Sequence, residues 1–500
     1  MTRLPPLAER LHDALPDAEQ QMAWIDEIVA FGVRRPGTDA GDRVTGWCAD
    51  RLAALGYEVE LQPVTAPTSH PGPARLIAHL VHDPERRLVV DGMTIPFTTS
   101  TQSQTFRLVP DRVDSPSIAG TDLACGAARL EHVRLTELPL SLLQDSFLAH
   151  HDPSGEFADH VQVLPFGSAL GKEIDAVVAA GAAGMVGVVD GPWTTSDYFV
   201  PYDGVVRPIP AMWIDRDQGA ALDELLTEGA VDIELSTTVE NRTATGHNVI
   251  ATAPAPGRDG DWIVIGSHHD APWASAVEDA SGIAQVLAQA RAWTAAAPEE
   301  RPASLAFLLT AAHMSDGAGT REFIASWTHR DRIRFALHLE HIAAEAEVDG
   351  EGALRPTDRP EVRWWFASAP QGGMRDAIVD TLRGELVEHE LVRSIVLPPD
   401  VFGPMPPTDG GFFHLAGIPM VNLLAAPMYL FDPADTPAMV HRPSLVPTAR
   451  VALDLTLAAA DGWPLADPPG ERADHDDVHH DVHDETGDTG AAGVAEEAAR

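Results

Sequence analysis

Histidines and a carboxylate stand at the ends of three apolar runs in the second half of the chain. His268 ends the run IVIGSH, His313 follows SLAFLLT after two alanines, and Glu340 directly follows FALHL. If these runs are neighbouring parallel strands, their carboxyl ends share one edge of a sheet, and the three side chains lie close together. Imidazole and carboxylate groups gathered in this way can bind a divalent metal ion or transfer protons.

The segments around these residues have the pattern of an α/β domain. From Asn248 onward, short apolar runs alternate with amphipathic stretches of 10 to 15 residues, which predicts a mostly parallel sheet covered by helices. Residues 7–15 and 21–31 place apolar side chains at helical spacing, and residues 43–64 are typical of a helix, a glycine turn and a strand. These N-terminal elements suit the outer layer of the same domain.

A change of pattern near Ala74 predicts an insertion. From there to about residue 245, strand-like runs separated by Pro, Asp and Gly indicate a β-rich module. The α/β domain is then discontinuous, over 1–73 and 246–465. Residues 466–500 have few apolar side chains and are expected to be a disordered, acidic, His-rich tail, which is more typical of a solvated segment than of a metal site.

Composition narrows the possible partners. The net charge of −41 argues against nucleic acid and anionic membranes, which attract positively charged surfaces. Two cysteines, Cys48 and Cys125, cannot form a disulfide framework or a four-thiolate metal site, so any metal must be held by His and carboxylates. Without an apolar leader or a long apolar segment, the chain is expected to be cytoplasmic. The sequence does not indicate an oligomeric state.

Seven runs carry a family resemblance: NVIATAPAP, IVIGSHHD, VEDASGIAQVLAQAR, SLAFLLTAAHMSDGAGTREF, ALHLEH, TDGGFFHLAGIPMVNL and YLFDPADTPAMV. In order and spacing they resemble the co-catalytic zinc aminopeptidases, a family that also includes glutamate carboxypeptidase, glutaminyl cyclase and the transferrin receptor. The resemblance covers residues 20–73 loosely and 246–460 well. It implies a zinc-aminopeptidase-like α/β fold, and AGAAGMVGVVDG with IPAMWIDRDQGAAL resembles the protease-associated insert of many members.

The resemblance assigns roles to residues on two loops. His268 matches the first metal ligand, with Asp270 as the carboxylate that orients its ring, although a buried structural histidine is the alternative. Glu278 occupies the place of the family's bridging aspartate. Asp279 follows it, and we expect Asp279 to cap the next helix, with a ligand role as the alternative.

Two further positions depart from the family pattern. His313 and Met314 stand where the family has paired glutamates, so His313 is a candidate general base or nitrogen ligand. Glu340 replaces the aspartate that would hold the first metal. The expected metal site is therefore His268, Glu278 and Glu340, with His313 as a further candidate.

The expected second metal site has lost two ligands. Met314 and Phe431 are apolar at positions where the family has a glutamate and a histidine. One divalent ion is expected, zinc by the resemblance, with iron and manganese equally compatible with the ligand types. Four neighbours are expected to pack around the site rather than bind the ion: His269, His338, His341 and Asp409.

These residues favour a metal-dependent hydrolase acting on a peptide or small amide, as in an aminopeptidase or amidohydrolase, with His313 as general base. Two alternatives remain: an inactive binding module, as in the receptor branch of the family, and a single-metal enzyme with cyclase-like chemistry. An aromatic loop with Trp193, Tyr198 and Tyr202 either lines a cleft or is purely structural. No nucleotide-binding glycine motif or nucleophile elbow is present.

Overall fold

The strands that end at the predicted site belong to one large sheet. The computed structural model describes residues 5–110, 126–165, 170–257 and 260–463. Among these residues, nine strands pair in the order β1-β12-β14-β13-β15-β20-β18-β19-β7. Their bounds are β1 Glu58–Pro71, β7 Ala149–His151, β12 Val239–Ala253, β13 Trp262–His268, β14 Ser304–Thr310, β15 Ile333–Leu339, β18 Arg363–Ser368, β19 Ser394–Leu397 and β20 Met420–Ala425.

The centre of this sheet is parallel. Strands β14, β13, β15 and β20 run in the same direction, whereas β12 and β18 pair antiparallel on either side of them. Every residue of β13 and β14 is buried, which explains their continuous apolar sequences. The predicted parallel α/β core is therefore confirmed, and the carboxyl ends of its strands form one edge.

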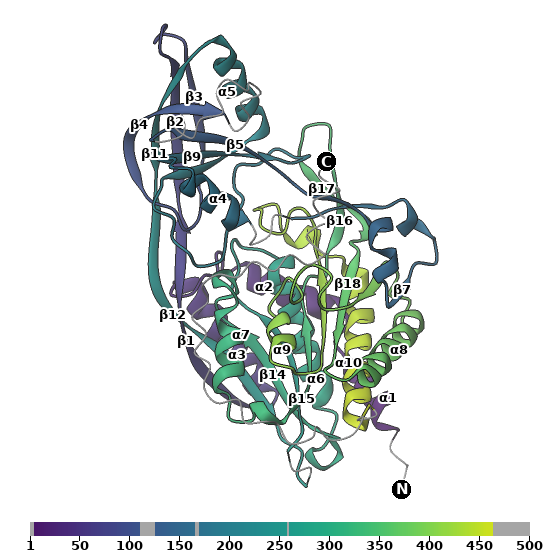
Figure 1. Cartoon of the computed structure of the whole chain (residues 1–500). Coiled ribbons are helices and arrows are strands. Elements are labelled where there is room, and N and C mark those ends of the chain that lie inside the picture. Colours follow the sequence, from purple (N-terminus) through teal and green to yellow (C-terminus); the bar gives the residue numbers. More distant parts are fainter. Residues whose placement is uncertain (1–4, 111–125, 166–169, 258–259, 464–500) are drawn as a thin grey trace.

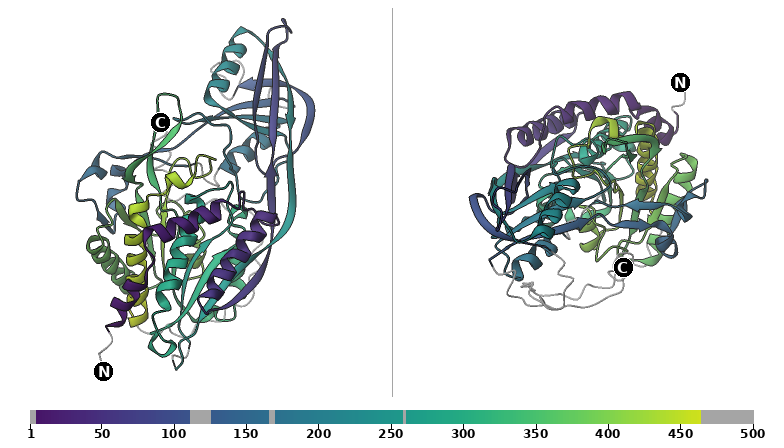
Figure 2. Two further views of the ribbon diagram at one scale, coloured as in Figure 1. Left: turned by 180° about the vertical axis from the view of Figure 1, so that it is seen from behind. Right: turned by 90° about the horizontal axis from the view of Figure 1, so that it is seen from above.

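Helices cover both faces of the sheet (Figures 1 and 2). The helices α1, α2, α3, α6, α8 and α10 pack into one apolar core with residues of β13, β14 and β15, and α7 and α9 cover the opposite face. The bounds are α1 Leu7–Ala14, α2 Ala18–Val29, α3 Asp39–Ala54, α6 Gly282–Trp293, α7 Ala318–Ser326, α8 Gly372–Glu388, α9 Gly411–Leu415 and α10 Leu445–Asp461. The three N-terminal helices thus form an outer layer, as their sequences predict.

The inserted module is a closed barrel, with strand order β10-β3-β2-β11-β4-β5-β9. Alternating burial along β2 and β11 fits a wall with one face inward. Helices α4 and α5 accompany it. The bounds are β2 Pro73–Leu80, β3 Arg87–Thr94, β4 Thr101–Pro110, β5 Ala128–Arg134, β9 Gly184–Asp190, β10 Ala211–Asp215, β11 Val231–Thr237, α4 Leu170–Ala179 and α5 Arg216–Glu228.

A long antiparallel ribbon joins the two parts. Strands β1 and β12 pair from Glu58 with Thr252 to Pro71 with Val239, and they run from the sheet edge to the barrel (Figure 1). One stretch of the expected 74–245 insert lies elsewhere, because β7 pairs with β19 and extends the main sheet. A segment of three residues, Ala-His-His, is too short to show the alternation that identifies a strand in a sequence.

Smaller elements complete the described chain. Two further antiparallel two-stranded sheets form, β16 with β17 and β6 with β8. No helix among the described residues is long and apolar enough to cross a membrane. Cys48 is buried and free, and the expected tail at 466–500 lies outside the described residues. The bounds are β6 Glu137–Pro139, β8 Val161–Val163, β16 Ala344–Val348 and β17 Leu354–Pro360.

Candidate metal centre

The structure brings together the four side chains expected to hold a metal. His268 is the last residue of β13, Glu340 directly follows β15, His313 lies in the turn after β14, and Glu278 lies on the loop before α6. His268, Glu278 and Glu340 are fully buried, and only 6% of His313 is exposed. The convergence follows from the parallel core, whose strand ends meet at one edge.

Two buried atoms of this cluster have no hydrogen-bond partner among the described residues. They are Nε2 of His268 and Oε1 of Glu278, which lie 3.5 Å apart. Two ligand atoms on a tetrahedral zinc ion, with bonds of about 2.0 to 2.1 Å, are separated by about 3.3 Å. A buried polar atom without a partner is costly, so the pair fits a shared cation better than an apolar environment.

The ring of His268 is oriented by a main-chain carbonyl. Its Nδ1 lies 3.0 Å from the carbonyl oxygen of Asp270, so the Nδ1–H donates there and leaves Nε2 with a lone pair. The expected contact between the ring and the Asp270 carboxylate is not formed. That carboxylate instead accepts the backbone N–H groups of His313 and Met314, at 2.9 and 3.0 Å. Asp270 therefore positions both histidines, through two different groups.

Glu278 and Asp279 take different roles. The Asp279 carboxylate accepts hydrogen bonds from the Ser267 hydroxyl and from the N–H of Gly282, the first residue of α6. It thus caps the helix, as a carboxylate does at exposed N–H groups. The backbone N–H of Glu278 donates to Asp435 at 2.9 Å, which fixes the loop while the Glu278 side chain points into the cluster.

His313 stacks on His268. The ring centroids are 3.9 Å apart and the planes differ by 11°. Because a nitrogen lone pair lies in its ring plane, the lone pairs of two stacked rings run side by side. His313 Nε2 is 3.6 Å from Glu278 Oε1, and its Nδ1 donates to Asp409 at 2.8 Å. The ligand atoms of His268, Glu278 and His313 lie within 4.8 Å of one another, so the arrangement is compatible both with a proton carrier beside the ion and with the expected further nitrogen ligand.

His341, which the sequence suggests as a packing residue, reaches the same cluster. Its Nδ1 donates to the carbonyl of Ala425 at 2.7 Å, so an ion would bind at Nε2, in exchange for the hydrogen bond of that nitrogen with Glu278. That Nε2 lies 2.6 Å from Glu278 Oε2 and 3.8 Å from Glu340 Oε2. The ligand atoms of His268, Glu340 and His341 all lie within 4.8 Å of one another. The one sequence signal for His341 is its position beside Glu340.

Glu340 is held by two neighbours. Thr408 donates its hydroxyl to the carboxylate, and His338 Nε2 donates to Oε1 at 2.6 Å. Burial alone would raise the pKa of Glu340, but His338 and the other nearby imidazoles lower it below its usual value. Glu340 is thus kept ionised, which is the form that binds a metal.

Two residues that stand where the family pattern has ligands of a second ion are buried in the core. Met314 and Phe431 are each 3% exposed and belong to the main core. Tyr202, on the loop between β9 and β10 of the barrel, places its ring 5.7 Å from His313 and 5.1 Å from Phe431. At these two positions the chain therefore carries buried apolar side chains that pack in the core.

The barrel covers the centre. Phe199 donates its backbone N–H to the carbonyl of Phe431 at 2.9 Å, and Trp193 Nε1 donates to Asp432 at 3.0 Å. Trp193 and Tyr198 are at most 2% exposed. Residues 193–202 are called the roof loop below. Of the two sequence alternatives, Trp193 and Tyr198 fit a structural role, whereas Tyr202 contacts the site itself.

The centre concentrates buried negative charge. Burial raises the pKa of Asp270 to about 6 and that of Asp435 to about 7, and it raises the pKa of Asp279 well above its usual value. Glu278 and Glu340 add two further carboxylates with full burial. A raised pKa favours the neutral form of a carboxyl, and a carboxylate that stays ionised here needs a compensating charge, which neighbouring protonated imidazoles or a divalent cation can supply. The donors present therefore fit one such ion.

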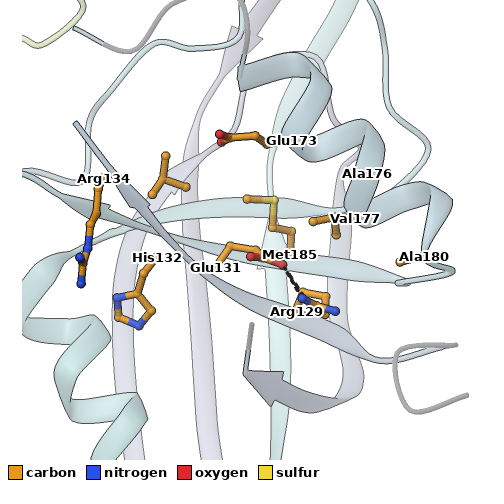
Figure 3. Close-up of a pocket in the computed structure, with 10 residues that line it drawn as sticks. Arg129, Glu131, His132, Arg134, Glu173, Ala176, Val177, Ala180 and Met185 are labelled. Atoms are coloured by element: carbon orange, nitrogen blue, oxygen red, sulfur yellow. Dashed lines mark hydrogen bonds and ion pairs between the residues drawn. The ribbon is translucent and has the colours of Figure 1, made fainter. Parts of the chain in front are cut away.

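A separate hollow lies in the barrel (Figure 3), between β5, β9 and α4. It has a volume of about 380 Å³ and is lined by both charge signs, with Arg129 paired to Glu131 at 3.1 Å. None of its lining residues belongs to the metal centre. Its mixed lining does not indicate a ligand of one charge.

The fold is similar to that of solved peptidases. An aminopeptidase from Aneurinibacillus sp. strain AM-1 is 18% identical, with a TM-score of 0.61 over 90% of this chain and 96% of the other. A zinc aminopeptidase from Bacillus subtilis is 15% identical, with a TM-score of 0.59 over 89% and 95%. A peptidase M28 precursor from Shewanella amazonensis is 17% identical, with a TM-score of 0.66 over 92% and 97%.

This chain has the zinc aminopeptidase fold. Coverage of nearly the whole of each chain means that the similarity includes the inserted region as well as the sheet domain. No protein-family model and no curated protein matches the chain. The fold predicted from the sequence runs is therefore confirmed, and identities below 20% make the reaction a question for the residues of the centre itself.

Proposed function

We propose that the chain is a metal-dependent hydrolase that uses one divalent ion, zinc by preference, to cleave a peptide or other amide bond. The observation that carries the proposal is the pair of partnerless buried atoms, His268 Nε2 and Glu278 Oε1, at 3.5 Å. His268, Glu278 and Glu340 would hold the ion, with His341 as a fourth donor. This replaces the fourth ligand position suggested for His313 with a residue whose Nε2 faces both carboxylates.

A divalent ion at such a site polarises a substrate carbonyl and lowers the pKa of water. The protein would supply the proton transfer. Asp409 accepts the Nδ1–H of His313, so the neutral ring has its lone pair on Nε2, where it can accept a proton from water. Burial alone would lower the pKa of His313, but Asp409 and the carboxylates Glu278 and Glu340 raise it well above its usual value. Neutralisation of those carboxylates by a cation would favour the basic form.

The substrate is proposed to be a small amide or a peptide end rather than an extended chain. The roof loop and the loop around Phe431 bury the centre, with 0% exposure of His268 and Glu278. Peptide cleavage would need the roof loop to move, and a small amide would need less movement. The centre lies in a covered, low-dielectric interior, where its fixed charges act more strongly than in water.

Complete burial also favours the alternative of an inactive binding module. A closed roof over an ion would stabilise the fold without any turnover. Cyclase-like chemistry is a second alternative, since a single ion with a nearby base can also promote attack by an internal amine. Neither alternative predicts hydrolysis of added amides.

An activity assay separates these proposals. The full chain, dialysed against a chelator and then supplied with zinc, manganese or iron(II), is assayed with aminoacyl anilides, dipeptides, N-acyl amides and N-terminal glutaminyl peptides. The proposal predicts zinc-restored hydrolysis that His313→Ala abolishes while metal content is retained. Cyclised product without hydrolysis would favour the cyclase alternative. Metal binding with no turnover of any substrate would favour the binding module.

A further inference from the structure

A second cluster of imidazoles and carboxylates lies on the opposite part of the sheet domain from the barrel, where α1, α8 and α10 lie side by side (Figure 1). His12 comes from α1, His389 caps the C-terminal end of α8, and Asp454 lies in α10. Nε2 of His12 and Nε2 of His389 each lie 2.7 Å from a different oxygen of the Asp454 carboxylate. Three elements far apart in sequence thus direct their polar atoms to one point.

A fourth donor stands one helical turn away. Glu385 precedes His389 by four residues, and its Oε2 lies 3.4 Å from His389 Nε2. Residues four apart lie on the same face of a helix, so the two side chains can chelate one ion together. The set contains two imidazole nitrogens and two carboxylate oxygens, a donor combination that zinc accepts.

The cluster is accessible, unlike the main centre. Side-chain exposure is 23% for His12, 11% for His389 and 18% for Asp454. Their ligand atoms all lie within 4.8 Å of one another, so small side-chain rotations would bring them to bonding distance of one ion. Partial exposure lets an ion enter from solvent and retain a water molecule.

We propose that His12, His389 and Asp454, together with Glu385, form a second metal site for a borderline divalent cation such as zinc. The site is independent of the proposed function and shares no residue with the main centre. Its effect would be to fasten α1 to the body of the domain. Helix α1 has only eight residues and no side-chain hydrogen bond at its N-cap, Pro6, so its order depends on tertiary contacts, which already include the buried Leu11.

The test compares full chains by zinc binding. Wild type, His12→Ala and His389→Ala are stripped with a chelator, and bound zinc is measured after equilibrium dialysis. His79→Ala, which removes a half-buried histidine of β2, is the matched control. The proposal predicts roughly one equivalent less in His12→Ala and His389→Ala than in wild type and the control. Histidines of the C-terminal segment 475–485 are present in every chain, so their binding cancels in the differences.

A second readout localises the ion. Amide hydrogen exchange of residues 7–14 is expected to slow on zinc addition in wild type and not in His12→Ala, a change at a part-buried polar side chain outside the apolar core. Equal zinc content in all four chains, together with unchanged exchange of α1, would overturn the proposal. The two histidines would then only form hydrogen bonds with Asp454. His268→Ala is expected to remove only the ion of the main centre. Its zinc content therefore tests the main centre separately from the site at His12 and His389.

Discussion

Asp409 is hydrogen-bonded to Nδ1 of His313, while the other ring nitrogen, Nε2, lies toward Glu278. Its Oδ1 accepts the Nδ1–H of His313 at 2.8 Å, and Oδ2 accepts the Thr320 hydroxyl at 2.8 Å. Burial alone would raise the pKa of Asp409, but His313 lowers it below its usual value, so the carboxylate stays ionised. This contact decides which nitrogen of His313 carries the proton.

Asp409→Asn tests that role. An amide can present N–H to His313 Nδ1 and so favour the tautomer with the proton on Nε2, which cannot act as a base. We expect kcat to fall by roughly 10²- to 10⁴-fold with zinc content unchanged. Thr320→Val, which removes one hydrogen bond to Asp409 and keeps its charge, should have a much smaller effect. Loss of zinc in Asp409→Asn would show that His313 is a ligand and not the base.

Tyr202→Ala tests the contact between the barrel and the centre. The change removes a ring that packs on His313 and Phe431. Because Tyr202 is only half-buried, we expect a loss of about 2 kcal/mol in the free energy of unfolding, less than for a fully buried aromatic side chain. Chemical unfolding measures it. Tyr202→Phe keeps the ring and should remain within about 0.5 kcal/mol of wild type; an equal loss in both variants would contradict the packing account.

Glu361→Gln tests a buried carboxyl outside the centre. Burial raises the pKa of Glu361 to about 7, against the opposing hydrogen bond from the N–H of Val362. A carboxyl whose pKa is higher in the folded state than its model value of 4.5 binds more protons when folded between these pH values. Wild-type stability should therefore decline as pH rises from about 4.5 through 7.

The glutamine variant should lack that decline. Its amide oxygen can keep the hydrogen bond from Val362, and no charge is buried at high pH. Above pH 7 it should be more stable than wild type by about 2 to 3 kcal/mol, and near pH 4.5 the two should be similar. Urea unfolding between pH 4.5 and 8 measures this, with Glu60→Gln on an exposed face as the control. A constant difference at all pH values would contradict the assignment.

The sequence pattern predicts which strands and loops carry the residues of the centre. It predicts much less well which atoms of those residues contact one another. His268, His313 and Glu340 could be placed together because strand ends in a parallel sheet meet at one edge, a rule that needs only periodicity and order. The roles of Asp270 and His341 could not be predicted, because they depend on which atoms face each other. Asp270 uses its carbonyl for one histidine and its carboxylate for the turn that holds another.

The contact between Tyr202 and His313 could not be predicted from the sequence either. It depends on how the barrel lies against the sheet domain, and that position is set by the β1–β12 ribbon and by the roof loop contacts. Local patterns identify the ribbon strands but not the angle between the parts they connect. The expectation of a single ion, by contrast, needs only the residue types of Met314 and Phe431, and it stays a prediction.

The most direct test of the account is the zinc content of the full chain beside His268→Ala and Glu278→Gln, measured by mass spectrometry after dialysis in zinc-replete buffer. The account predicts that each variant retains roughly one equivalent less than wild type, because His268→Ala removes one of the two partnerless buried atoms and Glu278→Gln removes the negative charge at the other. His269→Ala, which changes the adjacent buried histidine whose Nε2 faces the carbonyl of His247, is the control and should keep the wild-type content. Equal zinc content in all four folded chains would contradict the proposed metal centre.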